Sequence, residues 1–189
     1  MGELQVQKLK NNPLKALYIK QLLVDIAALE QILDKKMFEL SPIRIGAEQE
    51  FCLVDEFWQP SNKALEVLEN IDDPHFTTEL ALYNLEINLD PLPLSGNCFS
   101  EMHLQLDHLL AMANKVAEKS ATKIILCGIL PTIAKRHLDF EYLTPIPRYN
   151  ILNEVIKEIR NNDIEIHIKG VDELNIRHDS VLFEGCNTS

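Results

Sequence analysis

Glycine is scarce in this chain, and its glycines do not form the glycine-rich motifs of nucleotide-binding loops. Six glycines occur among 189 residues, and none belongs to a Walker-type phosphate loop. The chain also contains no HExxH pair and no Gly-x-Ser-x-Gly elbow, so neither zincin nor α/β-hydrolase chemistry is indicated. If the protein binds a nucleotide, we expect it to hold the phosphates through metal ions.

Cysteines are few and widely separated, and long apolar runs are absent. The four cysteines form no CxxC pair, which argues against a zinc site and against a disulfide framework. Cys52 and Cys127 lie in apolar, strand-like runs, and we interpret them as buried thiols. No apolar run reaches the ~18 residues of a membrane span, and the N-terminus lacks the apolar core of a signal peptide. We therefore expect a cytoplasmic protein without a membrane partner.

Positive charge is also in the minority. Lysine and arginine total 18 against 29 aspartates and glutamates, for a formal net charge of −11. Such a balance argues against a general nucleic-acid surface or an anionic membrane surface. The expected partners are small molecules, and phosphates would have to be neutralised locally.

Hydrophobic spacing predicts a mixture of helices and strands. Apolar residues recur at helical spacing from Pro13 to about Leu40, in a short segment at 64–71, and again over about 99–120 and 148–161. Strands are predicted at 43–54, around Glu86, at 123–130 and 164–169, and from about 181 onward, with a turn at 170–179. The predicted fold class is α+β: a curved, mainly antiparallel sheet with flanking helices and a polar face lined by glutamates.

Acidic residues occupy the polar face of two of these strands. Glu48 and Glu50 are two residues apart, so their carboxylates point the same way. Glu86 lies on the polar face of a second strand, and Glu79 comes seven residues earlier. If the strands pair, up to four carboxylates converge, and oxygen ligands of this kind suit a hard cation such as Mg²⁺. The alternative is a solvated sheet face with scattered surface acids.

The motifs around these acids resemble a known enzyme family. Gly46-x-Glu48-x-Glu50-Phe51, followed by Thr77-Thr78-Glu79 and then Glu86-Ile87-Asn88-x-x-Pro91, resembles the glutamate–cysteine ligases and related carboxylate–amine ligases of glutamine synthetase-like fold. The resemblance covers roughly residues 43–189. It implies that Glu48, Glu50, Glu79 and Glu86 bind Mg²⁺ ions around ATP and the substrate carboxylate.

The resemblance also implies a two-step reaction. The γ-carboxylate of glutamate attacks the γ-phosphate of ATP to give an acyl phosphate, and the amine of cysteine, or another amine, then displaces phosphate. An Arg-Tyr pair that opens a helix is similar to the family pattern, which makes Arg148 the candidate catalytic residue. Its guanidinium could bind a carboxylate or phosphate through two hydrogen bonds. The alternative is an ordinary surface arginine.

The sequence predicts that the chain has two regions. Residues 1–42 form an N-terminal helix that the resemblance leaves unexplained, and residues 43–189 form the N-terminal part of a ligase catalytic domain. The sequence stops within a predicted strand, so we expect a truncated, inactive fragment whose exposed strand edge favours self-association. Two other readings stay open. One is a non-catalytic regulatory module that binds a metal or an amino acid. The other is a degenerate ligase with an oligomerisation helix at residues 1–40.

Overall fold

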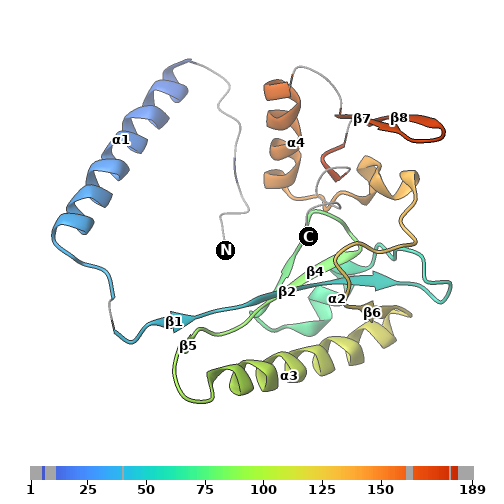
Figure 1. The fold of residues 1–189 in the computed structure, drawn as a ribbon, viewed down its shortest axis with the longest axis horizontal. Coiled ribbons are helices and arrows are strands. Elements are labelled where there is room, and N and C mark those ends of the chain that lie inside the picture. Colours follow the sequence, from blue (N-terminus) through green and yellow to red (C-terminus); the bar gives the residue numbers. More distant parts are fainter. Residues whose placement is uncertain (1–5, 7–11, 40, 161–163, 179, 183–189) are drawn as a thin grey trace.

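The computed structural model describes residues 6, 12–39, 41–160, 164–178 and 180–182. Four α-helices, eight strands and two 3-10 turns are assigned in these ranges, and Figure 1 shows their arrangement. The helices are α1 (Asn12–Asp34), α2 (Ala64–Ile71), α3 (Cys98–Lys119) and α4 (Pro147–Arg160). The strands are β1 (Arg44–Ile45), β2 (Glu48–Val54), β3 (Phe76–Thr78), β4 (Asn84–Asn88), β5 (Leu92–Pro93), β6 (Lys123–Ile125), β7 (Ile164–Lys169) and β8 (Glu173–His178).

The central sheet has the strand order β3-β4-β2-β6, and every pairing in it is antiparallel. One face packs on α2 and α3, which lie below the sheet in Figure 1. Phe51 and Leu53 of β2 and Leu85 and Ile87 of β4 point into this core and are fully buried. The alternate residues of the same strands therefore face the other way, toward α4. The α+β class is confirmed.

Helix periodicity located the helices well. The segment predicted at 64–71 is α2, and those predicted at 99–120 and 148–161 are α3 and α4, each shifted by one residue at both ends. Helix α1 ends at Asp34, six residues before the predicted Leu40. Residues 35–38 turn away from the helix axis, and Lys36 has a positive φ of 52°. A left-handed residue cannot continue a right-handed helix.

Several strand predictions need correction. The predicted strand 43–54 is split into β1 and β2, and β1 pairs with β5 in a separate two-stranded sheet. The predicted strand 123–130 is only three residues long, because β6 lies at the sheet edge and follows β2 for three residue pairs. The predicted turn at 170–179 contains β8, which forms a hairpin with β7. The strand predicted from about 181 is not extended at 180–182, where the chain bends and turns, and its remainder lies outside the described residues.

A histidine between two aspartates ties the start of β3 to the end of β4. His75 Nδ1 lies 2.7 Å from Asp73 Oδ1, and its Nε2 lies 3.2 Å from Asp90 Oδ2. The hydrogen bonds to Asp73 and then Asp90 raise the pKa of His75 above its usual value. A raised histidine pKa contributes stability that is present below about pH 6.5 and is lost as the pH rises through the folded-state pKa.

We predict that His75→Gln lowers the free energy of unfolding by about 0.5–1 kcal/mol below about pH 6 and by less near pH 8, since these contacts are partly exposed. Urea unfolding at several pH values measures the difference. His103→Gln is the matched control, because His103 also lies near an aspartate, Asp107 at 3.3 Å, but its side chain is 71% exposed. An equal loss at both pH values would contradict the predicted role.

Candidate metal centre

Strand pairing places two of the predicted metal ligands opposite each other. In the antiparallel register of β2 and β4, Glu50 pairs with Glu86, and Glu86 in turn pairs with Thr77 of β3. Because Phe51 and Leu85 fill the core on the far face, both glutamates project from the polar face. Directly opposed residues have Cβ atoms ~5 Å apart, so the two carboxylates are forced into the same small region.

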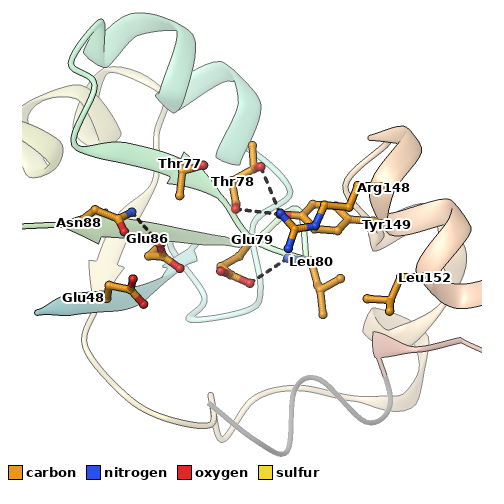
Figure 2. Close-up of a pocket in the computed structure, with 10 residues that line it drawn as sticks. All are labelled: Glu48, Thr77, Thr78, Glu79, Leu80, Glu86, Asn88, Arg148, Tyr149 and Leu152. Atoms are coloured by element: carbon orange, nitrogen blue, oxygen red, sulfur yellow. Dashed lines mark hydrogen bonds between the residues drawn. The ribbon is translucent and has the colours of Figure 1, made fainter. Parts of the chain in front are cut away.

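Glu79 reaches the same region from a loop. It follows β3, and its own carboxylate accepts a hydrogen bond from the Leu80 N–H at 3.1 Å (Figure 2). The loop is fixed by the segment before α4: the Thr144 hydroxyl donates to the Glu79 carbonyl at 2.6 Å, and the Thr144 N–H donates to the Leu80 carbonyl at 2.8 Å. The position of Glu79 therefore depends on residues more than sixty positions away in the chain.

The structure brings Glu50, Glu79 and Glu86 together. One carboxylate oxygen of each lies within 4.8 Å of the others, and all three side chains are half-buried. Burial raises the pKa of Glu50, and the charges of Glu86 and Glu48 raise it further. Burial also raises the pKa of Glu79 to about 7, aided by its hydrogen bond with Glu86 and by the charges of Glu50 and Glu86. Near neutral pH Glu79 thus resists full ionisation.

A bound cation would relieve that repulsion. Carboxylate oxygens are hard donors, and Mg²⁺ is usually held by a few carboxylates together with water and phosphate oxygens. The three glutamates fit that donor chemistry, because they offer only oxygen and come from three separate segments of the chain. Asn88 supports the arrangement, since its side-chain amide donates to Glu86 Oε1 at 2.5 Å and orients that carboxylate.

Glu48, the fourth predicted ligand, lies at the margin. It is the first residue of β2, pairs with Asn88 and is exposed. It lines the same cavity and is close enough to raise the pKa of Glu50. Among the described residues, it does not belong to the group whose carboxylate oxygens all lie within 4.8 Å of one another. Its place suits a contact to a second ion or to a ligand in the cavity.

Glu48, Glu79 and Glu86 line a cavity of about 450 Å³ between the sheet and α4, and Glu50 lies beside these acids without lining it. Figure 2 shows Glu48, Glu86 and Glu79 along one side of it and Arg148 at the other end. The cavity is lined by Glu48, Thr77, Thr78, Glu79, Leu80, Glu86, Asn88, Arg148, Tyr149 and Leu152. Its size suits a small ligand, and its lining combines negative charge with one guanidinium.

Arg148 is the second residue of α4, and a neighbouring contact holds it in place. The Tyr149 hydroxyl donates to the Thr78 carbonyl at 2.9 Å and fixes the start of α4 against the end of β3. Arg148 itself is exposed, and within the described residues it makes no hydrogen bond or ion pair. Its five donors are thus available to an anionic group in the cavity.

Six of the lining residues were not predicted as site residues: Thr77, Thr78, Leu80, Asn88, Tyr149 and Leu152. The signal for Asn88 was present, because it alternates with Glu86 and must share its face of β4. Thr77 is placed by the pairing of β3 with β4, and the strand β3 was not predicted.

Searches of protein-family models, curated proteins and solved structures give no match for this chain. No helix in the described part of the chain is long and apolar enough to cross a bilayer.

Proposed function

We propose that this chain is part of an ATP- and Mg²⁺-dependent carboxylate–amine ligase, similar to the glutamate–cysteine ligases and built on a curved sheet of glutamine synthetase-like fold. The observation that carries the proposal is the cluster of Glu50, Glu79 and Glu86, two of which, Glu79 and Glu86, line a cavity that also contains Arg148. These residues come from four separate segments, and they are among those that the sequence motifs designate.

Each group has a distinct role in the proposed reaction. Glu50, Glu79 and Glu86 would hold Mg²⁺, with Glu48 at the margin of the site. Bound Mg²⁺ supplies charge neutralisation, so that a carboxylate and a phosphate can approach each other. Arg148 would bind an anionic group of the substrate through its fork of donors. The glutamates act as ligands rather than as general bases, and the acceptor amine is cysteine or another amine.

The proposal is tested by nucleotide turnover in the longest gene product that contains these 189 residues. We expect ADP release that requires Mg²⁺, glutamate and an amine together. ADP release that is independent of glutamate would overturn the ligase assignment. Saturable metal binding without any ATP turnover would favour the regulatory module that binds a metal or an amino acid.

We predict that Arg148→Gln weakens binding of ATP by about tenfold when Mn²⁺ is saturating, because a charged hydrogen-bonding partner contributes about 1.4 kcal/mol or more. Arg148→Lys should recover only part of the affinity, since lysine keeps the charge but loses the fork geometry. Calorimetric titration of ATP into the chain measures both effects.

The matched control for this titration is Arg136→Gln. Arg136 is engaged by Gln59 at 3.2 Å and does not line the cavity. Equal affinities for wild type and Arg148→Gln would remove Arg148 from the proposed site.

A further inference from the structure

Two cysteines that are 75 positions apart in the chain meet on one face of the central sheet. The Sγ atoms of Cys52 and Cys127 lie 4.0 Å apart. The sequence predicts that both thiols are buried. The structure confirms this for Cys52, whose side chain is 3% exposed, whereas Cys127 is half-buried. The pair therefore joins a sulfur hidden from solvent to one that solvent can reach.

Strand register explains why the two sulfurs are close. Cys52 of β2 lies opposite Ile125, the last residue of β6. Because Phe51 points into the core formed with α2 and α3, its neighbour Cys52 points to the opposite face, the one that carries Glu50. Cys127 comes two residues after Ile125, so it is the diagonal neighbour of Cys52 at the edge of the sheet.

Apolar side chains surround the pair and keep most of the water away from it. The cluster consists of Cys52, Val54 and Leu130, with Ile125, Cys127 and Ile133 packed against it. A reagent in solution therefore meets the half-buried Cys127 sulfur before the buried Cys52 sulfur.

The chain after β6 can supply the movement that a disulfide requires. An S–S bond is ~2.05 Å long, so the two sulfurs must approach each other by about 2 Å. Strand β2 is held on both sides by β4 and β6, and Phe51 is fully buried. Beyond Ile125 the chain is no longer in the sheet, residues 128–129 form a bend, and Leu126 and Ile129 are half-exposed. The approach therefore falls on residues 126–129.

We propose that Cys52 and Cys127 are a reversible thiol–disulfide pair, which small disulfides oxidise by reaction at Cys127. The Cys127 thiolate attacks one sulfur of the small disulfide, forms a mixed disulfide with it and expels a small thiolate. The Cys52 thiolate then attacks the Cys127 sulfur and expels the second small thiolate. Two protein thiols are oxidised to one disulfide, the small disulfide is reduced to two thiols, and these take up the two protons that the cysteines release.

The oxidised form would fasten the chain after β6 to the central strand, two residues from Glu50. Disulfides of this kind act as redox sensors in proteins whose other thiols stay reduced. The inference concerns a site separate from the metal centre and does not depend on the proposed ligase activity.

Oxidation of the 189-residue chain with bis(2-hydroxyethyl) disulfide at pH 8 tests the proposal. This probe is small and uncharged, so the acidic character of the chain does not repel it. Peptide mapping of the native wild-type chain under non-reducing conditions should find one linkage, between Cys52 and Cys127, and dithiothreitol should reverse it. The map needs no substitution at the buried Cys52. Absence of the linkage, or a linkage to Cys98 or Cys186 in similar yield, would overturn the proposal.

Two variants test the order of the steps. Cys52→Ala should retain the probe on Cys127 as a stable mixed disulfide, because no second thiol displaces it. Cys127→Ala should react with the probe at Cys52 at least tenfold more slowly, because that sulfur is nearly inaccessible. Cys98→Ala is the matched control, since Cys98 is buried outside this cluster, and it should form the linkage as wild type does. Equal rates at Cys52 and Cys127 in the two variants would overturn the assignment of Cys127 as the entry thiol.

Discussion

Glu86→Gln is expected to lower the affinity of the chain for Mn²⁺ or Mg²⁺ by at least 10–100-fold. Glu86 is the central member of the cluster, because it pairs with Glu50 across β2 and β4, shares a hydrogen bond with Glu79 and is oriented by Asn88. Loss of even an indirect partner of a metal ligand commonly costs 10–100-fold, and loss of a ligand costs no less. Glutamine keeps the size and removes the charge, so the fold should survive.

Calorimetric titration of Mn²⁺ into wild type and variants measures this loss. Glu50→Gln should behave like Glu86→Gln, whereas Glu48→Gln should lose less because Glu48 lies at the margin of the site. Glu69→Gln on the exposed side of α2 is the control for a general loss of negative charge. Equal affinities for wild type and Glu86→Gln would show that these acids are a solvated sheet face.

Glu79→Gln is expected to stabilise the metal-free chain at pH 8 by about 2 kcal/mol. The pKa of Glu79 rises from 4.5 to about 7 on folding. Between these two values the folded state binds more protons than the unfolded state, so the free energy of unfolding falls as the pH rises. A shift of this size corresponds to a limit of ~3 kcal/mol at 1.36 kcal/mol per pKa unit, and partial exposure of Glu79 lowers it.

Two conditions separate this effect from an ordinary change in stability. Near pH 3 wild type and Glu79→Gln should unfold at the same urea concentration, because Glu79 is then protonated in both states. At pH 8, added Mg²⁺ should stabilise wild type and not the variant, since only wild type gains from binding in the folded state. A variant less stable than wild type at pH 8 without metal would contradict the proposed repulsion.

The part of the site that was predictable from sequence depends on local periodicity. Alternation in β2 and β4 placed Glu48, Glu50 and Glu86 on one polar face, and the opposite residues filled the core as expected. Helix α4 was located from its apolar spacing, so Arg148 was correctly placed near a helix start.

The rest of the site and of the fold depends on long-range contacts, which the periodicity of apolar residues does not encode. Glu79 is positioned by hydrogen bonds from Thr144, and Arg148 faces the acids because the Tyr149 hydroxyl binds the Thr78 carbonyl. The loss of most of the predicted strand 123–130 has a similar cause. Its residues are apolar enough for a strand, but β2 offers only three of its residues to β6. Pairing partners, rather than propensity, set the length of an edge strand.

The opposed pair Glu50 and Glu86 also bears on how the sheet avoids misfolding. A slip of β4 against β2 by one residue would exchange the two faces of the strand. Glu86 would then enter the core between the sheet and α3, where an unpaired carboxylate is costly to bury. Leu85 and Ile87 would at the same time be left in water. Glu86, whose proximity to Glu50 destabilises the folded sheet, therefore also disfavours the nearest misaligned register of β4. A site that weakens the native state thus helps to make that state unique.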